Sequence, residues 1–192
     1  MPPNAADDAA RAALRARQGA GARYDADAAP AGDLLLARRG AAFFARKLNE
    51  LRDIDFTGPS RRVGWTRARL VADTSFRARE AAIALKSLRE NLTAEEATWT
   101  PDLDLAETLP VRALRGLFQH SDIHLNVEFR DLSSDDWDRE IRIGGRTVQV
   151  RTLPLLRAHD LWHGAIDLAN GAREADMPDR IRTGDASAPT RK

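Results

Sequence analysis

The chain of 192 residues contains no cysteine. Disulfides, thiolate metal ligands and a thiol nucleophile supplied by the protein are therefore excluded. The uncharged apolar runs are much shorter than a membrane span. No segment joins a basic start to an apolar stretch and a cleavage site, as a secretory leader does. We therefore predict a cytoplasmic protein that makes no contact with a membrane.

An excess of charge of either sign is also missing, because 30 basic residues face 29 acidic ones. Without a broad basic field, the composition gives no reason to expect nucleic acid as a partner. The arginine-rich stretches, such as Arg61-Arg62, are typical of solvated helix ends and surface. We expect a small-molecule substrate as the partner, and the sequence leaves a homodimer open.

The apolar side chains are concentrated in the middle of the chain. A hydrophobic content of 43% suffices for one core, and the length fits one domain with tails. Residues 1–32 and 173–192 are polar and poor in large apolar side chains, so we expect flexible extensions at both ends. The predicted folded unit is therefore 33–172.

Inside this unit the apolar residues repeat at helical spacing. One helix is predicted to begin at Asp33 as its N-cap, a second near Thr66 and a third near Leu109. The apolar positions of the first helix share one stripe: Leu36, Phe43, Phe44, Leu48 and Leu51. Each helix is longer than most globular helices, which favours an antiparallel bundle.

A hairpin interrupts the helical pattern before the last helix. Residues 139–143 and 146–150 alternate with period two around Gly144-Gly145, which predicts two strands joined by a tight turn. A fourth helix follows, with Pro154 in its first turn and Gly171 after its end. The predicted fold class is mostly all-α: an antiparallel four-helix bundle with a small β-hairpin before the last helix.

All four histidines fall on the last two predicted helices. His120 and His124 form one pair, His159 and His163 the other, and both have i, i+4 spacing. Such a pair lies on one helix face and can bind a metal. Asp160 precedes His163 by three residues, another spacing found in metal-binding bundles. A polar sector of a helix is also typical of the solvent face, so the spacing alone leaves both interpretations open.

Three segments together resemble a known family. They are LLARRGAAFFARKLNEL (35–51), GPSRRVGWTRARLVAD (58–73) and LRAHDLWHGAIDL (156–168), and the tetrapeptide Gly-Trp-Thr-Arg at 64–67 is their most specific element. This pattern resembles the mycothiol-dependent maleylpyruvate isomerases, within the DinB/YfiT-like helical bundles. The resemblance implies a four-helix bundle with one divalent metal, usually zinc, on three side chains. It also implies that an open metal position engages the thiol of mycothiol.

The sequence departs from the family's pattern at the ligands that the resemblance implies. Asp73 stands where the family has its first histidine ligand, Asp160 stands in place of the glutamate, and Gly164 stands in place of the last histidine. Arg69 replaces a further histidine of many relatives. An oxygen-rich site rebuilt from Asp73, Asp160 and His163 would suit zinc poorly. We therefore expect no divalent metal.

Three functions remain open. The favoured one is an enzyme of specialised metabolism, with an actinobacterial setting left open. It would act on a small organic substrate by metal-independent acid–base chemistry, with Asp73, Asp160 and His163 as catalytic residues. The residues expected to bind the substrate are Trp65, Arg69, His120 and His124. We also expect Asp73 and Asp160 to face each other, and one of the two to hold a proton or to pair with an arginine such as Arg69. No cofactor is required, although mycothiol or another low-molecular-weight thiol remains open. The alternatives are a thiol-dependent isomerase or transferase with an unusual metal site, and a non-catalytic binding protein.

Overall fold

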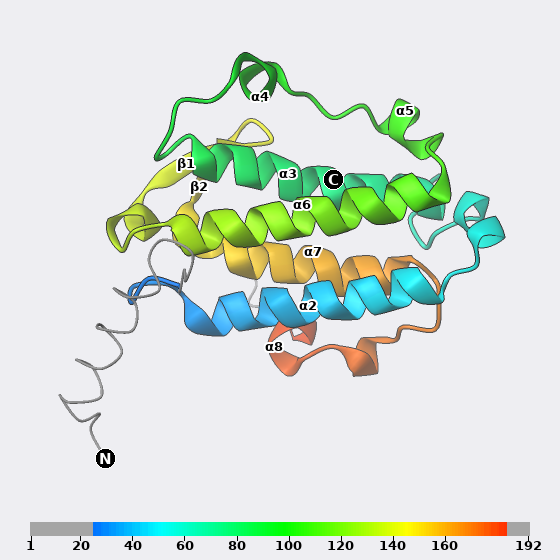
Figure 1. Ribbon diagram of the computed structural model, residues 1–192. Coiled ribbons are helices and arrows are strands. Elements are labelled where there is room, and N and C mark those ends of the chain that lie inside the picture. Colours follow the sequence, from blue (N-terminus) through cyan, green and yellow to red (C-terminus); the bar gives the residue numbers. More distant parts are fainter. Residues whose placement is uncertain (1–24, 184–192) are drawn as a thin grey trace, which may run out of the picture.

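Four long helices form the main elements of the structure, a computed structural model that describes residues 25–183 (Figure 1). They are α2 (Ala31–Glu50), α3 (Arg67–Lys86), α6 (Val111–Asp131) and α7 (Leu153–Asp167). Together with the hairpin described below, they confirm the predicted fold class. No helix in the described part of the chain is long and apolar enough to cross a membrane.

The helices run as two parallel pairs, and the two pairs are antiparallel to each other. One cluster of buried side chains joins the beginnings of α2 and α7 to the ends of α3 and α6, through Leu34, Leu153, Leu85 and Phe129. Helices α3 and α6 share a direction because the connection between them, residues 87–110, passes along the whole bundle (Figure 1). This crossover refines the simple antiparallel expectation.

The beginnings of two helices illustrate the local rules. The second helix begins near Thr66 as expected. Thr66 is the N-cap of α3, and its Oγ1 accepts a hydrogen bond of 3.1 Å from the amide of Arg69. The expected cap of the first helix was wrong, because α2 begins at Ala31 after Pro30. Asp33 lies in the first turn of α2, where its carboxylate forms an ion pair of 2.7 Å with Arg180.

The predicted hairpin is confirmed. Strands β1 (Glu140–Ile143) and β2 (Arg146–Gln149) pair antiparallel across Gly144 and Gly145, whose φ angles of 57° and 76° need glycine. The amide of Gly144 donates a 2.7 Å hydrogen bond to Glu80 Oε1, which fastens the turn to α3. The hairpin therefore covers one side of the bundle at α3.

The folded unit is longer than the predicted 33–172. Beyond it the chain forms η5 (Glu174–Asp176) and α8 (Asp179–Arg182). Met177 and Ile181 are buried in the same core as α2 and α7, so residues 173–183 are part of the domain. Before α2, Asp25 pairs with Arg38 at 2.6 Å. The remainder of the two predicted extensions, 1–24 and 184–192, lies outside the described residues.

Candidate functional site

A cavity of about 830 Å³ opens between α3, α6, α7 and the hairpin. Its apolar wall includes Phe76 of α3, Leu125 and Phe129 of α6, and Val148 of the hairpin. The polar part of its lining comes largely from α3 and α7 and contains Asp73, Arg77, His159, Asp160, His163 and Asp167. The three residues predicted to be catalytic, Asp73, Asp160 and His163, therefore line one cavity. Such a site, apolar with a few convergent polar groups, is typical of small-molecule binding.

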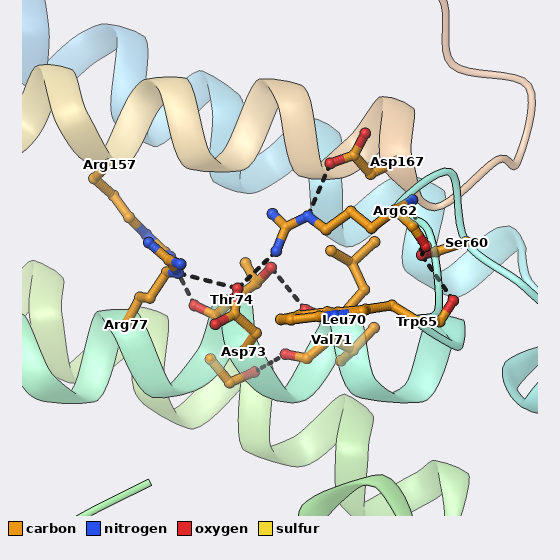
Figure 2. A network of polar contacts seen from close by, with 11 residues as sticks. Ser60, Arg62, Trp65, Leu70, Val71, Asp73, Thr74, Arg77, Arg157 and Asp167 are labelled. Atoms are coloured by element: carbon orange, nitrogen blue, oxygen red, sulfur yellow. Dashed lines mark hydrogen bonds and ion pairs between the residues drawn. The ribbon is translucent and has the colours of Figure 1, made fainter. Parts of the chain in front are cut away.

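Asp73 is held by two arginines. Its side chain is 11% exposed, and its Oδ2 accepts hydrogen bonds from Arg62 Nη1 at 2.9 Å and Arg77 Nε at 3.0 Å. Arg62 Nε also donates to Asp167 Oδ2 at 3.1 Å, so one guanidinium bridges α3 and α7 (Figure 2). Asp73 thus pairs with arginine as expected, but its partners are Arg62 and Arg77 and not Arg69.

Arg77 carries charge into the cavity. Burial acts to lower the pKa of its guanidinium, but the attraction of Asp160 and then of Asp73 outweighs it, and the pKa lies above its ordinary value. The side chain is nevertheless 44% exposed, so this cation is available to a ligand. The placement of Arg77 beside Asp73 could have been predicted from the sequence, because Arg77 follows Asp73 by one helical turn on the same helix face.

The loop of residues 58–66 places Arg62 beside Asp73. The amide of Ser60 donates to the carbonyl of Trp65 at 2.8 Å, and Gly64 takes a φ of 77° in the turn between them. The amide of Arg61 donates to the carbonyl of Asp167 at 2.8 Å, which fastens the loop to the end of α7. Arg67 extends this joint, since its Nε donates to the carbonyl of Leu168 at 2.7 Å. The Gly-Trp-Thr-Arg tetrapeptide is therefore a structural joint between α3 and α7.

The four residues predicted to bind the substrate lie outside this cavity. Trp65 lies between two guanidiniums, with Arg62 at 5.1 Å and Arg69 at 5.3 Å from its ring centre. Arg69 in turn binds Asp104 and Glu107 of the crossover. Trp65 and Arg69 thus contact these partners and do not line the cavity, and their role as substrate ligands stays a prediction.

The histidines of α6 are also away from the cavity. His120 is exposed, and His124 Nε2 lies 3.3 Å from Glu128 Oε1 one turn further along the same helix. The histidines of α7 both line the cavity, and their rings lie nearly parallel, with centres 5.9 Å apart. His159 was therefore missed as a site residue, although the i, i+4 spacing placed it on the same face as His163.

Arg157 is a further lining residue that the sequence analysis missed. It is 6% exposed, and its Nη1 donates to the backbone carbonyl of Thr74 at 2.8 Å (Figure 2). Its Nη2 lies 3.3 Å from Asp122 Oδ1 on α6. Its partners are far from it in the sequence, so no local spacing of residues could have identified it.

Known proteins similar to this chain are found by sequence and by structure. The family described as mycothiol maleylpyruvate isomerase N-terminal domain matches residues 37–169. The chain belongs to this family. Crystal structures of the mycothiol-dependent maleylpyruvate isomerase and of a histidine-to-alanine variant of it match with a TM-score of 0.68, at 29% and 30% identity. Each match covers 78% of this chain and 65% of the isomerase chain, so the similarity spans under two thirds of those proteins. No curated protein matches the sequence.

The predicted maleylpyruvate isomerase resemblance is thus confirmed, and it raises the question of the metal. At Gly164 there is no ligand, and a Cβ there would lie 3.2 Å from Phe44 Cε2 and 3.6 Å from Thr74 Oγ1. Asp73 already accepts two guanidinium hydrogen bonds. Among residues 25–183 no three His, Asp or Glu side chains converge in a way that could hold a metal ion. The side chains at these positions do not fit the divalent metal that the family implies.

Proposed function

We propose that this protein is an enzyme that binds a small organic molecule in the cavity and moves a proton with Asp160 and His163, without a divalent metal. The observation that carries the proposal is the pairing of Asp73 with Arg62 and Arg77 beside a cavity lined by Asp160 and His163. Guanidinium groups supply positive charge where the family's pattern calls for a metal. The ionisable groups of α7 remain at the cavity to act on a ligand.

Asp160 and His163 are suited to proton transfer by their placement. They lie within one turn of each other on α7, so one ligand can reach both. His163 is exposed, and histidine is the side chain that most often acts as a general acid or base. Asp73 is proposed to act through Arg77, which lines the cavity and donates a hydrogen bond from its Nε to Asp73 Oδ2.

Arg77 is proposed to bind an anionic group of the ligand. Its guanidinium stays protonated throughout the physiological range and is partly exposed at the cavity. The apolar wall of Phe76, Leu125 and Phe129 would hold the remainder of a small organic molecule. This division between charged and apolar walls would orient the ligand toward Asp160 and His163.

A thiol-dependent isomerase or transferase is the second candidate, and the family favours it. The structural neighbours are mycothiol-dependent, and this chain has no cysteine of its own, so a thiol would arrive with mycothiol or a similar molecule. A neighbouring arginine stabilises a thiolate. Arg77 lines the cavity with a partly exposed guanidinium, so it could do so there.

Isomerisation of maleylpyruvate in the presence of mycothiol, followed with and without a chelator, tests both candidates. We expect turnover that the chelator leaves unchanged and that falls at least about 100-fold in kcat/KM in the D160N and H163A variants. The matched control is H120A, which removes an exposed histidine outside the cavity and should leave kcat/KM unchanged.

Three results would contradict the proposal. Activity that is lost with the chelator and restored by zinc would establish a metal enzyme. Equal losses in H163A and H120A would remove the cavity from the reaction. Calorimetric binding of mycothiol or maleylpyruvate without any turnover would identify a non-catalytic binding protein.

A further inference from the structure

We propose that Arg62 is a built-in cation that joins α3 to α7 in place of a divalent ion and positions Asp73 and Arg77 at the cavity. The inference concerns how the site is held together, and it does not depend on the reaction proposed above. It rests on the two carboxylates that this single side chain binds, and on the loop that delivers it.

The contacts of Arg62 have the form of a bridge. Nη1 donates to Asp73 on α3 and Nε donates to Asp167 on α7, at 2.9 and 3.1 Å. A guanidinium presents its donors in a fixed planar fork, so it can hold two carboxylates at a set separation. Two helices whose ionised side chains share one cation are cross-linked, as they would be by a metal ion.

Burial makes this bridge stronger than a surface ion pair. The side chains of Arg62, Asp73 and Asp167 are 18%, 11% and 22% exposed. A charge removed from water to this degree destabilises the fold when it is left unpaired. Removal of one partner therefore lowers the free energy of unfolding strongly. The three groups therefore depend on one another.

The loop holds Arg62 in place before any ligand binds. Its guanidinium lies over the ring of Trp65 at 5.1 Å, and its amide donates to Ser60 Oγ at 3.2 Å. The neighbouring amide of Arg61 is bound to the carbonyl of Asp167. Backbone and side chain thus attach the same loop to the same residue of α7, which fixes the position of the cation.

The two arginines that bind Asp73 have different positions relative to the cavity. Both donate to Oδ2, but Arg77 lines the cavity and Arg62 does not. Arg62 is therefore a positioning residue, and Arg77 is the cation that a ligand meets. A divalent ion that approached Asp73 would meet two fixed positive charges already in hydrogen-bonding contact with the same oxygen, which opposes its binding.

Thermal unfolding of a set of variants, combined with elemental analysis of bound metal, tests the assignment. The variants are R62Q, R62K, D167N and the double variant R62Q/D167N. The matched control is R61Q. The side chain of Arg61 is exposed and forms no hydrogen bond or ion pair with another residue in 25–183.

We expect the wild-type protein to hold less than one metal ion per chain and to keep its Tm in a chelator. R62Q should lower Tm by at least about 5 °C, whereas R61Q should change it by no more than about 2 °C. R62K should recover part of the loss, because it restores the charge but not the fork. R62Q/D167N should lose less than the sum of its two single variants, since removing both partners leaves no orphaned charge.

Four outcomes would overturn the assignment. They are a stoichiometric metal whose removal lowers Tm, equal effects of R62Q and R61Q, no recovery in R62K, and additive losses in the double variant. If R62Q does not fold, D167N and R62K still report on the bridge. None of these measurements involves a substrate, so their failure would be separate from failure of the proposed reaction.

Discussion

Helices α6 and α7 each carry two histidines at i, i+4 spacing, but the surroundings of the two pairs differ. On α7, His159 and His163 line the cavity. On α6, His120 is exposed and His124 meets Glu128 of its own helix. The same local pattern therefore lies on a cavity-lining face of one helix and on an outer face of the other.

The difference comes from what each helix packs against. Helix α6 turns Leu114, Phe118 and Leu125 toward the interior, which leaves its histidines on the other side. Helix α7 packs on α2 through the stacked rings of Trp162 and Phe43, whose centres are 4.8 Å apart. Its polar sector is thereby turned toward α3, where the cavity lies, and not to open solvent. Spacing identifies a face, but packing decides what that face meets.

The variant with the largest expected effect tests whether the inner face of α7 can be converted to a metal site. We expect the triple variant D73H/D160E/G164H to bind no zinc and to lose at least about 3 kcal/mol of unfolding free energy. The reasons are the lost carboxylate partner of two arginines and the side chain forced against Phe44. Zinc titration calorimetry and urea unfolding measure the two results. One tightly bound zinc per chain at wild-type stability would contradict them, and G116H on α6 controls for introducing a histidine into a helix.

Two variants with intermediate expected effects compare one glycine of α7 with one glycine of α6. A Cβ at Gly164 would lie 3.2 Å from Phe44, whereas nothing lies within 4 Å of a Cβ at Gly116. We expect G164A to lose about 1 kcal/mol of unfolding free energy through overpacking. We expect G116A to gain about 0.5–1 kcal/mol from the higher helix propensity of alanine. Urea unfolding of both variants checks the opposite signs, and a change of the same sign in both would break the comparison.

The smallest effects belong to the outer histidines. We expect H124A to lose no more than about 1 kcal/mol of unfolding free energy, because its partly exposed contact with Glu128 is screened by solvent. We expect H120A to change the unfolding free energy by less than about 0.5 kcal/mol. Urea unfolding measures both. A loss in H120A as large as the loss in H124A would show that the outer face of α6 has a partner in solution.

Much of the fold was predictable because its signals are local. The start of a helix near Thr66 and the turn at Gly144-Gly145 depend on neighbours within a few residues, and both are found where they were expected. Part of the site was also predictable. Asp73, Asp160 and His163 were identified through the family's pattern, and they line one cavity. Trp65 belongs to the same pattern, but its role in the loop between α3 and α7 could not be inferred from the motif.

The four long helices, the hairpin, the family and the absence of a protein thiol follow from composition, periodicity or a contiguous motif. Which charged groups pair with each other depends on how the chain packs in three dimensions. Arg62 and Asp167 are 105 positions apart in the chain, yet one hydrogen bond joins them. Ile181, in a segment that reads as polar, completes the core beside α2 and α7. Contacts of this range depend on how whole helices pack, and no spacing along the chain encodes the partner that packing brings into reach.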